Sequence, residues 1–76
     1  MPTVARDGEF AFVIHTRELP FEPPHVHVWF SGAEIRIELD GGTLMDEAPA
    51  GRRRRILEAF SRHADVIRRK WEEIHG

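Results

Sequence analysis

One stretch of the chain, residues 25–39, decides the fold, and it reads His25-Val26-His27-Val28-Trp29-Phe30-Ser31-Gly32-Ala33-Glu34-Ile35-Arg36-Ile37-Glu38-Leu39. Apolar residues recur at every second position on both sides of Ser31-Gly32, as they do in strands that have one buried face. Ser31-Gly32 suits a two-residue hairpin turn. With that turn His25 faces Glu38, and every inward residue meets another inward residue. The stretch therefore predicts two antiparallel strands, over residues 25–30 and 33–39.

A further strand and a helix are predicted on either side of this hairpin. Residues 9–15 alternate in the same way and predict a strand, whereas the prolines of residues 16–24 predict an irregular loop. From Pro49 the apolar spacing changes to three and four residues, which predicts a helix over 49–75. Asp46 is the candidate residue for capping its start. The apolar stripe of this helix comprises Ile56, Phe60, Ala64, Ile67, Trp71 and Ile74.

These elements predict an α+β fold, in which a three-stranded antiparallel β-meander packs against one long C-terminal helix. The 76 residues are expected to form a single domain. One face of the sheet takes the helix. The other face is expected to carry His25, His27, Trp29, Glu34, Arg36 and Glu38.

Composition excludes several classes of protein. The chain has no cysteine, which excludes disulfides, thiolate zinc sites and a cysteine nucleophile. It has no apolar run near the roughly 20 residues of a membrane span and no signal core, so a cytoplasmic protein with no membrane partner is expected. The net charge is −2, but residues 1–47 carry three arginines and nine acids, whereas residues 48–76 carry seven arginines, one lysine and four acids. This asymmetry predicts an acidic sheet region and a basic helix, which bears on the choice of partner.

The histidines are the clearest candidates for chemistry. His25 and His27 are two positions apart on one strand and so point to the same side, about 7 Å apart at Cα. Such a pair can bind zinc or another divalent metal through imidazole nitrogen. His15 and Glu38 are expected beside them, which would give a site of three histidines and a carboxylate. The alternatives are ordinary cross-strand pairs with Arg36 and Glu38, or a metal-free role in partner contact or acid–base chemistry. No other cofactor is expected.

Other residues are candidates for partner binding. Trp29 shares the outer face and suits a binding anchor, unless the proline loop covers it. Arg36 lies on the same face. Arg52 and Arg53 belong to a run of four arginines at the helix start, which either holds phosphate or pairs with the nearby acids Asp46, Glu47 and Glu58. Nucleic acid is the minority alternative as a partner, because the whole chain is acidic.

The end of the predicted helix raises a separate expectation about partners. A helix over 49–75 is about 40 Å long, whereas strands of six or seven residues span only about 20–23 Å. Trp71 and Ile74 therefore extend the apolar stripe past the sheet. We expect a second copy or a cognate partner to cover them, with a folded-back Met1–Ala5 segment as the alternative.

Several of these motifs together resemble a known family. They are Met1-Pro2-Thr3-Val4, Glu22-Pro23-Pro24-His25-Val26-His27-Val28, a third strand led by Ala33, and a C-terminal helix with Trp71 and a near-terminal His75. The chain resembles the bacterial and archaeal family called domain of unknown function 4160. The resemblance implies a small free-standing protein, often encoded beside another small family and treated as a candidate component of a toxin–antitoxin pair. It supplies no catalytic residues.

Two functional hypotheses follow. The first is an interaction protein, one component of a toxin–antitoxin-like pair, whose partner is a cognate small protein or a second copy. The alternative is a metal-assisted or histidine-based enzyme, such as a nuclease acting on RNA, centred on His15, His25, His27 and Glu38. The first is preferred because the sequence contains no complete catalytic set, no Gly-rich phosphate loop and no Gly-x-Ser-x-Gly motif.

Overall fold

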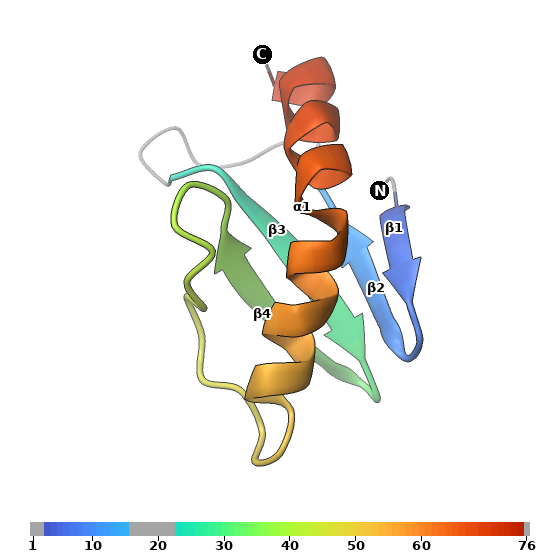
Figure 1. Ribbon diagram of the computed structural model, residues 1–76, viewed down its shortest axis with the longest axis vertical. Helices are drawn as coiled ribbons and strands as arrows, with labels where there is room; N and C mark the ends of the chain where they lie inside the picture. The colour runs from blue at the N-terminus through green and yellow to red at the C-terminus, as the bar shows by residue number, and fades with distance from the viewer. Residues whose placement is uncertain (1–2, 16–22, 76) are drawn as a thin grey trace.

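The fold is an antiparallel sheet with one long helix across one of its faces (Figure 1). The computed structural model describes residues 3–15 and 23–75. Its elements are β1 (Thr3–Asp7), β2 (Phe10–Val13), β3 (His25–Phe30), β4 (Ala33–Glu38) and α1 (Arg53–His75). Neighbouring strands pair in the order β1-β2-β3-β4, all antiparallel. The predicted α+β class is confirmed.

The number of strands differs from the prediction, because the sheet has four strands rather than three. The missed strand is β1, which pairs with β2 so that Asp7 faces Phe10. Gly8 begins the connecting turn at φ 59°, a conformation that glycine adopts without a steric penalty. The Asp7-Gly8 pair was a turn signal in the sequence. Of the Met1–Ala5 segment that was the alternative cover for the end of the helix, Thr3–Ala5 lies in β1, and Val4 and Ala5 pack against the core.

The hairpin register is confirmed residue by residue. Phe30 faces Ala33, and His25 faces Glu38 at the other end of the pair. Ser31 and Gly32 both have positive φ, 46° and 75°, as a type I′ turn requires. The agreement follows because a slip of one residue would turn the whole apolar set toward solvent.

The helix begins at Arg53, four residues later than predicted. Gly51 has φ 80°, which lies outside the helical region and interrupts the chain before a helix can begin at Pro49. Ile56 N–H donates to the Arg52 carbonyl at 2.9 Å, so Arg52 occupies the capping position. Asp46, the expected cap, instead accepts hydrogen bonds from Arg36.

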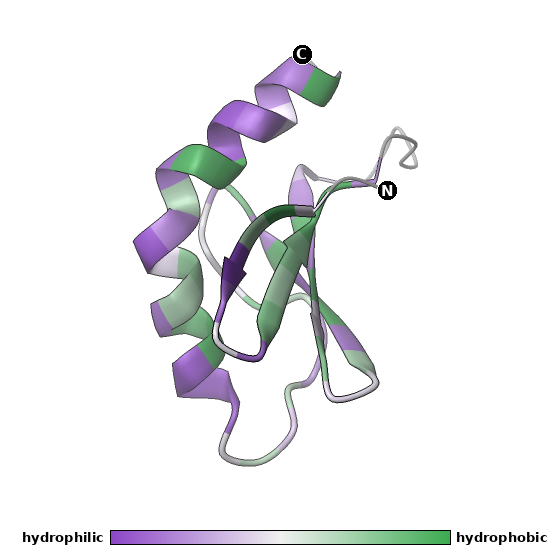
Figure 2. Ribbon diagram, turned by 90° about the vertical axis from the view of Figure 1, so that its right-hand side faces the viewer, coloured by the Kyte–Doolittle hydropathy of each residue, from purple (hydrophilic) through white to green (hydrophobic). Residues whose placement is uncertain are grey.

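The core lies between the sheet and α1, as the side view shows (Figure 2). Every second residue of the central strands and four residues in the first two thirds of α1 are buried there. The buried set is Phe10, Phe12, Ile14, Val26, Val28, Phe30, Ile35, Ile37, Leu39, Ile56, Ala59, Phe60 and Ile67. The helix thus occupies one face of the sheet and leaves the other face available for a site. No described helix is long and apolar enough to cross a membrane.

Candidate functional site

Four histidines and a tryptophan meet where the end of α1 approaches the sheet. The His15 ring stacks on His27 with centroids 3.7 Å apart, and His25 lies 5.0 Å from His27. Trp71 of α1 lies 6.1 Å from His25 and 4.0 Å from His75. His75 Nε2 donates to the His15 carbonyl at 2.7 Å, which closes the ring of contacts. The cluster therefore joins the end of α1 to β3 and to the residues that follow β2.

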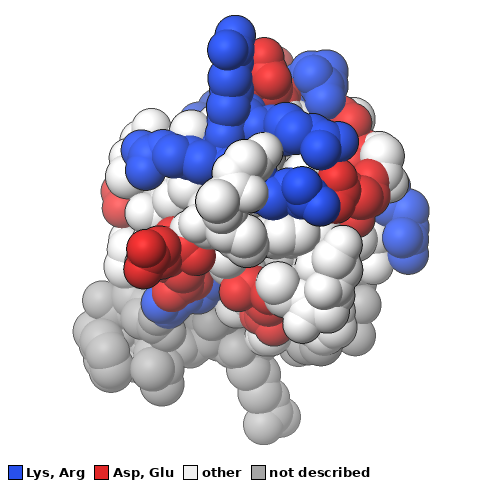
Figure 3. Space-filling view, turned by 90° about the horizontal axis from the view of Figure 1, so that it is seen from below, with Lys and Arg blue, Asp and Glu red and all other residues white. Residues whose placement is uncertain are grey.

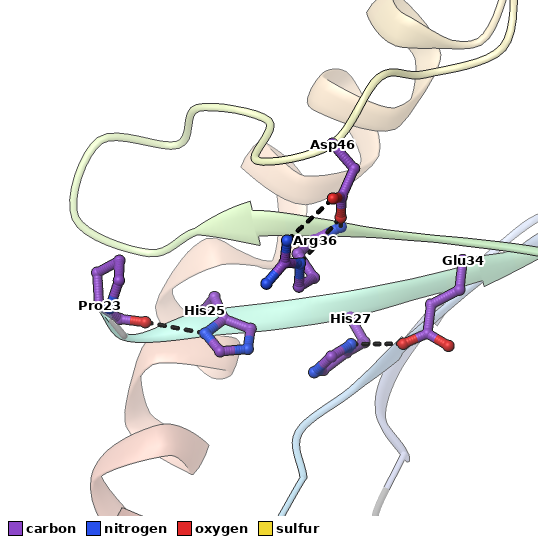
Figure 4. A network of polar contacts seen from close by, with 6 residues as sticks. All are labelled: Pro23, His25, His27, Glu34, Arg36 and Asp46. Carbon is purple, nitrogen blue, oxygen red and sulfur yellow. Dashed lines mark hydrogen bonds and ion pairs between the residues drawn. The ribbon is translucent and has the colours of Figure 1, made fainter. Parts of the chain in front are cut away.

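His27 is the centre of this cluster. It lies in the middle of β3, opposite Arg36, and is only 7% exposed. Its Nδ1 donates to Glu34 Oε2 at 2.6 Å, so a carboxylate orients the ring (Figure 4). A hydrogen bond to a carboxylate holds the imidazole ring in one orientation.

His25 is also held in one orientation. Its Nδ1 donates to the Pro23 carbonyl at 2.8 Å (Figure 4). The ring is 1% exposed and has Trp71 as a neighbour from α1. The strand alternation had placed His25 and His27 on a solvent face, and their burial is therefore a difference from that simple picture. The reason is that the end of α1 and His15 pack around this part of the sheet.

The carboxylate nearest the histidines is Glu34 rather than Glu38. Ligand atoms of His15, His27 and Glu34 all lie within 4.8 Å of one another. His25 and Glu38 do not belong to that group, although Glu38 does face His25 in the register. Glu34 was missed as a candidate because it faces Trp29. It reaches His27 along the diagonal between strands, a contact that the register already allowed.

Arg36 forms hydrogen bonds with Asp46 of the same chain. Its Nε and Nη2 donate to the two carboxylate oxygens of Asp46, each at 3.0 Å, and its backbone N–H donates to Oδ2 at 2.9 Å. These hydrogen bonds hold the pKa of Asp46 below its usual value. The segment around Asp46 also covers the outer edge of β4, because Met45 N–H donates to the Arg36 carbonyl and Leu44 bridges Ile37.

The arginines at the start of α1 lie among acidic side chains, at the end of the molecule seen in Figure 3. Arg52 and Arg55 both pair with Glu9, at 3.2 and 3.1 Å. Arg54 approaches Glu58 at 3.9 Å. The predicted neutralisation by Glu58 is thus present, and Glu9 is an additional partner that sequence spacing did not indicate. Arg53 is exposed at a shallow hollow that Leu57 and Ser61 also line.

Trp29 is the most exposed large apolar side chain among the described residues, at 42%. It borders a hollow on the outer face of the sheet. The other residues that line this hollow are Thr3, Arg6, Ala11 and Val13, from β1 and β2. The small side chain of Ala11 lies directly opposite Trp29 in the register, which leaves space beside the indole. Trp29 is therefore available on this face.

Trp71 and Ile74 are half-buried and pack against the core. The close tilted contact of Trp71 with His75 and its approach to His25 cover part of the indole from within the chain. Trp71 and Ile74 are therefore less exposed than the length of the helix had suggested. The expectation of a partner at this end loses its main physical reason.

Comparison with known protein families identifies the family to which the chain belongs. Residues 10–72 match the family described as "Domain of unknown function (DUF4160)". The match covers most of the 76 residues, and the chain belongs to this family. Searches of curated proteins and of solved structures found no match.

Proposed function

For this member of the domain of unknown function 4160 family, we propose that the function is to bind a second small protein through the outer face of the sheet, at β1 and Trp29. The observation that carries the proposal is the 42% exposure of Trp29 beside the hollow that β1 and β2 line. Tryptophan is the residue type most enriched among those that dominate binding energy at protein interfaces. In this proposal the complex is one of the toxin–antitoxin type, and this chain is one of its two components.

The two edges of the sheet support β1 as the docking edge. The edge of β4 is covered by residues 43–46, through the hydrogen bond of Met45 and the bridge between Leu44 and Ile37. No described residue pairs with the outer edge of β1. An open edge of this kind accepts an extended segment as a further strand, with main-chain hydrogen bonds providing affinity.

The chemistry of the hollow indicates what the partner presents. The indole of Trp29 and the side chains of Ala11 and Val13 offer apolar contact, and Arg6 adds a guanidinium group at the rim. An extended segment with an apolar residue for the hollow and a carboxylate for Arg6 fits these groups. Side chains along such a strand alternate, so the two requirements fall on residues two positions apart.

The experiment measures binding to a small protein whose gene neighbours that of this chain, which is the kind of partner that the family resemblance implies. Isothermal titration of that protein should give a one-to-one complex, and Trp29→Ala should weaken it by at least tenfold. Val66→Ala is the matched control, since Val66 is 40% exposed but lies on α1. Equal affinity of the Trp29 and Val66 variants, or a complex that only joins two copies of this chain, would contradict the proposal.

A second candidate function is a histidine-based or metal-assisted nuclease acting on RNA. The observation that favours it is the grouping of His15, His27 and Glu34. The pairing of Arg52 and Arg55 with Glu9 weighs against it, because those arginines already have a carboxylate partner in place of a phosphate. RNA cleavage that His27→Gln abolishes and Trp29→Ala does not change would favour this candidate over the first.

A further inference from the structure

We propose that His15, His27 and Glu34 form a binding site for one divalent transition-metal ion, and that zinc fits it best. One ligand atom from each residue lies within 4.8 Å of the other two. His27 comes from β3, Glu34 from β4, and His15 from the segment that follows β2. Two of the three donors therefore stand on paired strands, which hold donors more firmly than a loop does, and the third lies two residues after a strand.

The donor types select the class of ion. Two imidazoles and one carboxylate make up a frequent three-ligand set for zinc, with a fourth position left for water or substrate. Magnesium and calcium prefer oxygen donors alone, so two imidazoles disfavour them. The chain has no cysteine, so soft, thiolate-preferring ions have no ligand here. Nickel, cobalt and copper share the preference for imidazole and are distinguished from zinc by affinity.

The His27 ring is held in one orientation by its neighbours. Glu34 accepts the Nδ1 proton at 2.6 Å, which holds the ring in place, and an ion bound at Nδ1 takes the place of that proton. The His27 side chain is 9% exposed, whereas that of Glu34 is 41% exposed. His27 is therefore fixed, and Glu34 has room to move from the His27 ring to the ion.

Binding requires two small rearrangements. Donors at about 2.0–2.1 Å from a tetrahedral zinc lie about 3.3–3.5 Å from one another, so the 2.6 Å contact between His27 and Glu34 must lengthen. The ion must also lie in the plane of each ligating ring. The stacking of His15 on His27, at 3.7 Å, places the two rings face to face, so the His15 ring has to turn about its Cα–Cβ bond.

The other two histidines of the cluster, His25 and His75, lie outside the proposed metal site. His25 lies 5.0 Å from His27 with its Nδ1 bound to Pro23, outside the three-residue group. His75 holds the backbone carbonyl of His15 rather than its ring. These residues support the site from outside. This inference does not rest on the proposed interaction, because the metal group and the Trp29 hollow use different residues.

The test is a metal titration of protein from which any affinity tag and bound metal have been removed. Zinc in competition with a chromophoric chelator should give one ion per chain with a dissociation constant in the micromolar range or tighter. Cobalt should give visible absorption with the intensity of a tetrahedral complex. His27→Gln should weaken zinc binding by about 100-fold and Glu34→Gln by about 10-fold or more.

His63→Gln is the matched control, because His63 contacts Asp7 and lies outside the group. Its zinc affinity should equal that of the wild type. Circular dichroism checks the fold of each variant, and Glu34→Gln decides the question if the buried His27 variant does not fold. Wild-type protein that binds no zinc below about 100 μM, or a Glu34 variant with unchanged affinity, overturns the proposal. Equal losses in the His63 and Glu34 variants overturn it as well.

Discussion

Arg62 in α1 donates two hydrogen bonds to Asp7 at the end of β1, from Nε at 2.8 Å and from Nη2 at 3.1 Å. His63 Nε2 contacts the same carboxylate at 3.1 Å. These two residues therefore attach the first strand to the middle of the helix. The attachment explains how a short edge strand stays in the sheet although its residues are only partly buried.

The attachment predicts a pH dependence of stability. The hydrogen bonds from Arg62, and then from His63, hold the pKa of Asp7 below its usual 3.8. A carboxyl whose folded pKa is lowered stabilises the protein above the unfolded pKa, and that contribution is lost as the pH falls through the folded pKa. Asp7→Asn should therefore be less stable than the wild type at pH 7, and the two should converge as the pH falls through the lowered pKa of Asp7.

Urea unfolding of both proteins from pH 7 to pH 2 measures this difference. Arg62→Gln should lower stability in the wild type but have little effect in the Asp7→Asn background, because the partner is already gone. A gap between the wild type and Asp7→Asn that stays constant down to pH 2 would disprove the ionic contribution of this pair.

The hairpin turn predicts opposite effects of two neighbouring substitutions. Gly32 has φ 75° and open space where a Cβ would lie, so Gly32→Ala should cost about 1 kcal/mol through its backbone conformation alone. Ser31 has φ 46°, and asparagine tolerates that conformation better than serine, so Ser31→Asn should stabilise the protein by a few tenths of a kcal/mol. Thermal unfolding of the two variants measures both. Destabilisation by both substitutions would argue against the type I′ turn.

The end of the helix predicts a loss of stability rather than a loss of association. Trp71 packs against His75 and the core while remaining half-buried, so Trp71→Ala should destabilise the single chain by about 2 kcal/mol. Urea unfolding gives this value, and sedimentation of the same variant should match the wild type. A wild-type assembly that the Trp71→Ala, Ile74→Ala variant dissociates would instead restore the expectation of a partner at this end.

The central hairpin could be predicted from sequence because two independent signals agreed there. The alternation of residues 25–39 and the two-residue turn Ser31-Gly32 allow only one register that buries all the apolar side chains, and that register is observed. The helix stripe was equally clear, since Ile56 and Ile67 are fully buried. These features depend on local periodicity, which a single sequence records well.

The errors have physical causes of a different kind. β1 was missed because it is a short, partly exposed edge strand without a strong period, and its place depends on Asp7 meeting Arg62, a contact between distant residues. The helix start was placed too early because the change of apolar spacing was taken to begin the helix at Pro49, whereas Gly51 has φ 80°.

The candidate site was predicted only in part for a similar reason. His15 was expected beside the histidine pair, but at His25, whereas its ring stacks on His27. The choice of Glu34 over Glu38 depends on side-chain direction, and the burial of His25 depends on where the helix ends. Neither follows from the period of a strand. Both became clear only once the end of α1 was placed against the sheet.

Amide hydrogen exchange tests the proposed interaction most directly. The rates are compared for the chain alone and for its complex with the proposed partner protein. If the partner adds a strand to the open edge, the outward-facing amides of Thr3–Asp7 slow on binding and those around Val66 do not change. Protection that falls on α1 and leaves β1 unchanged would contradict the account.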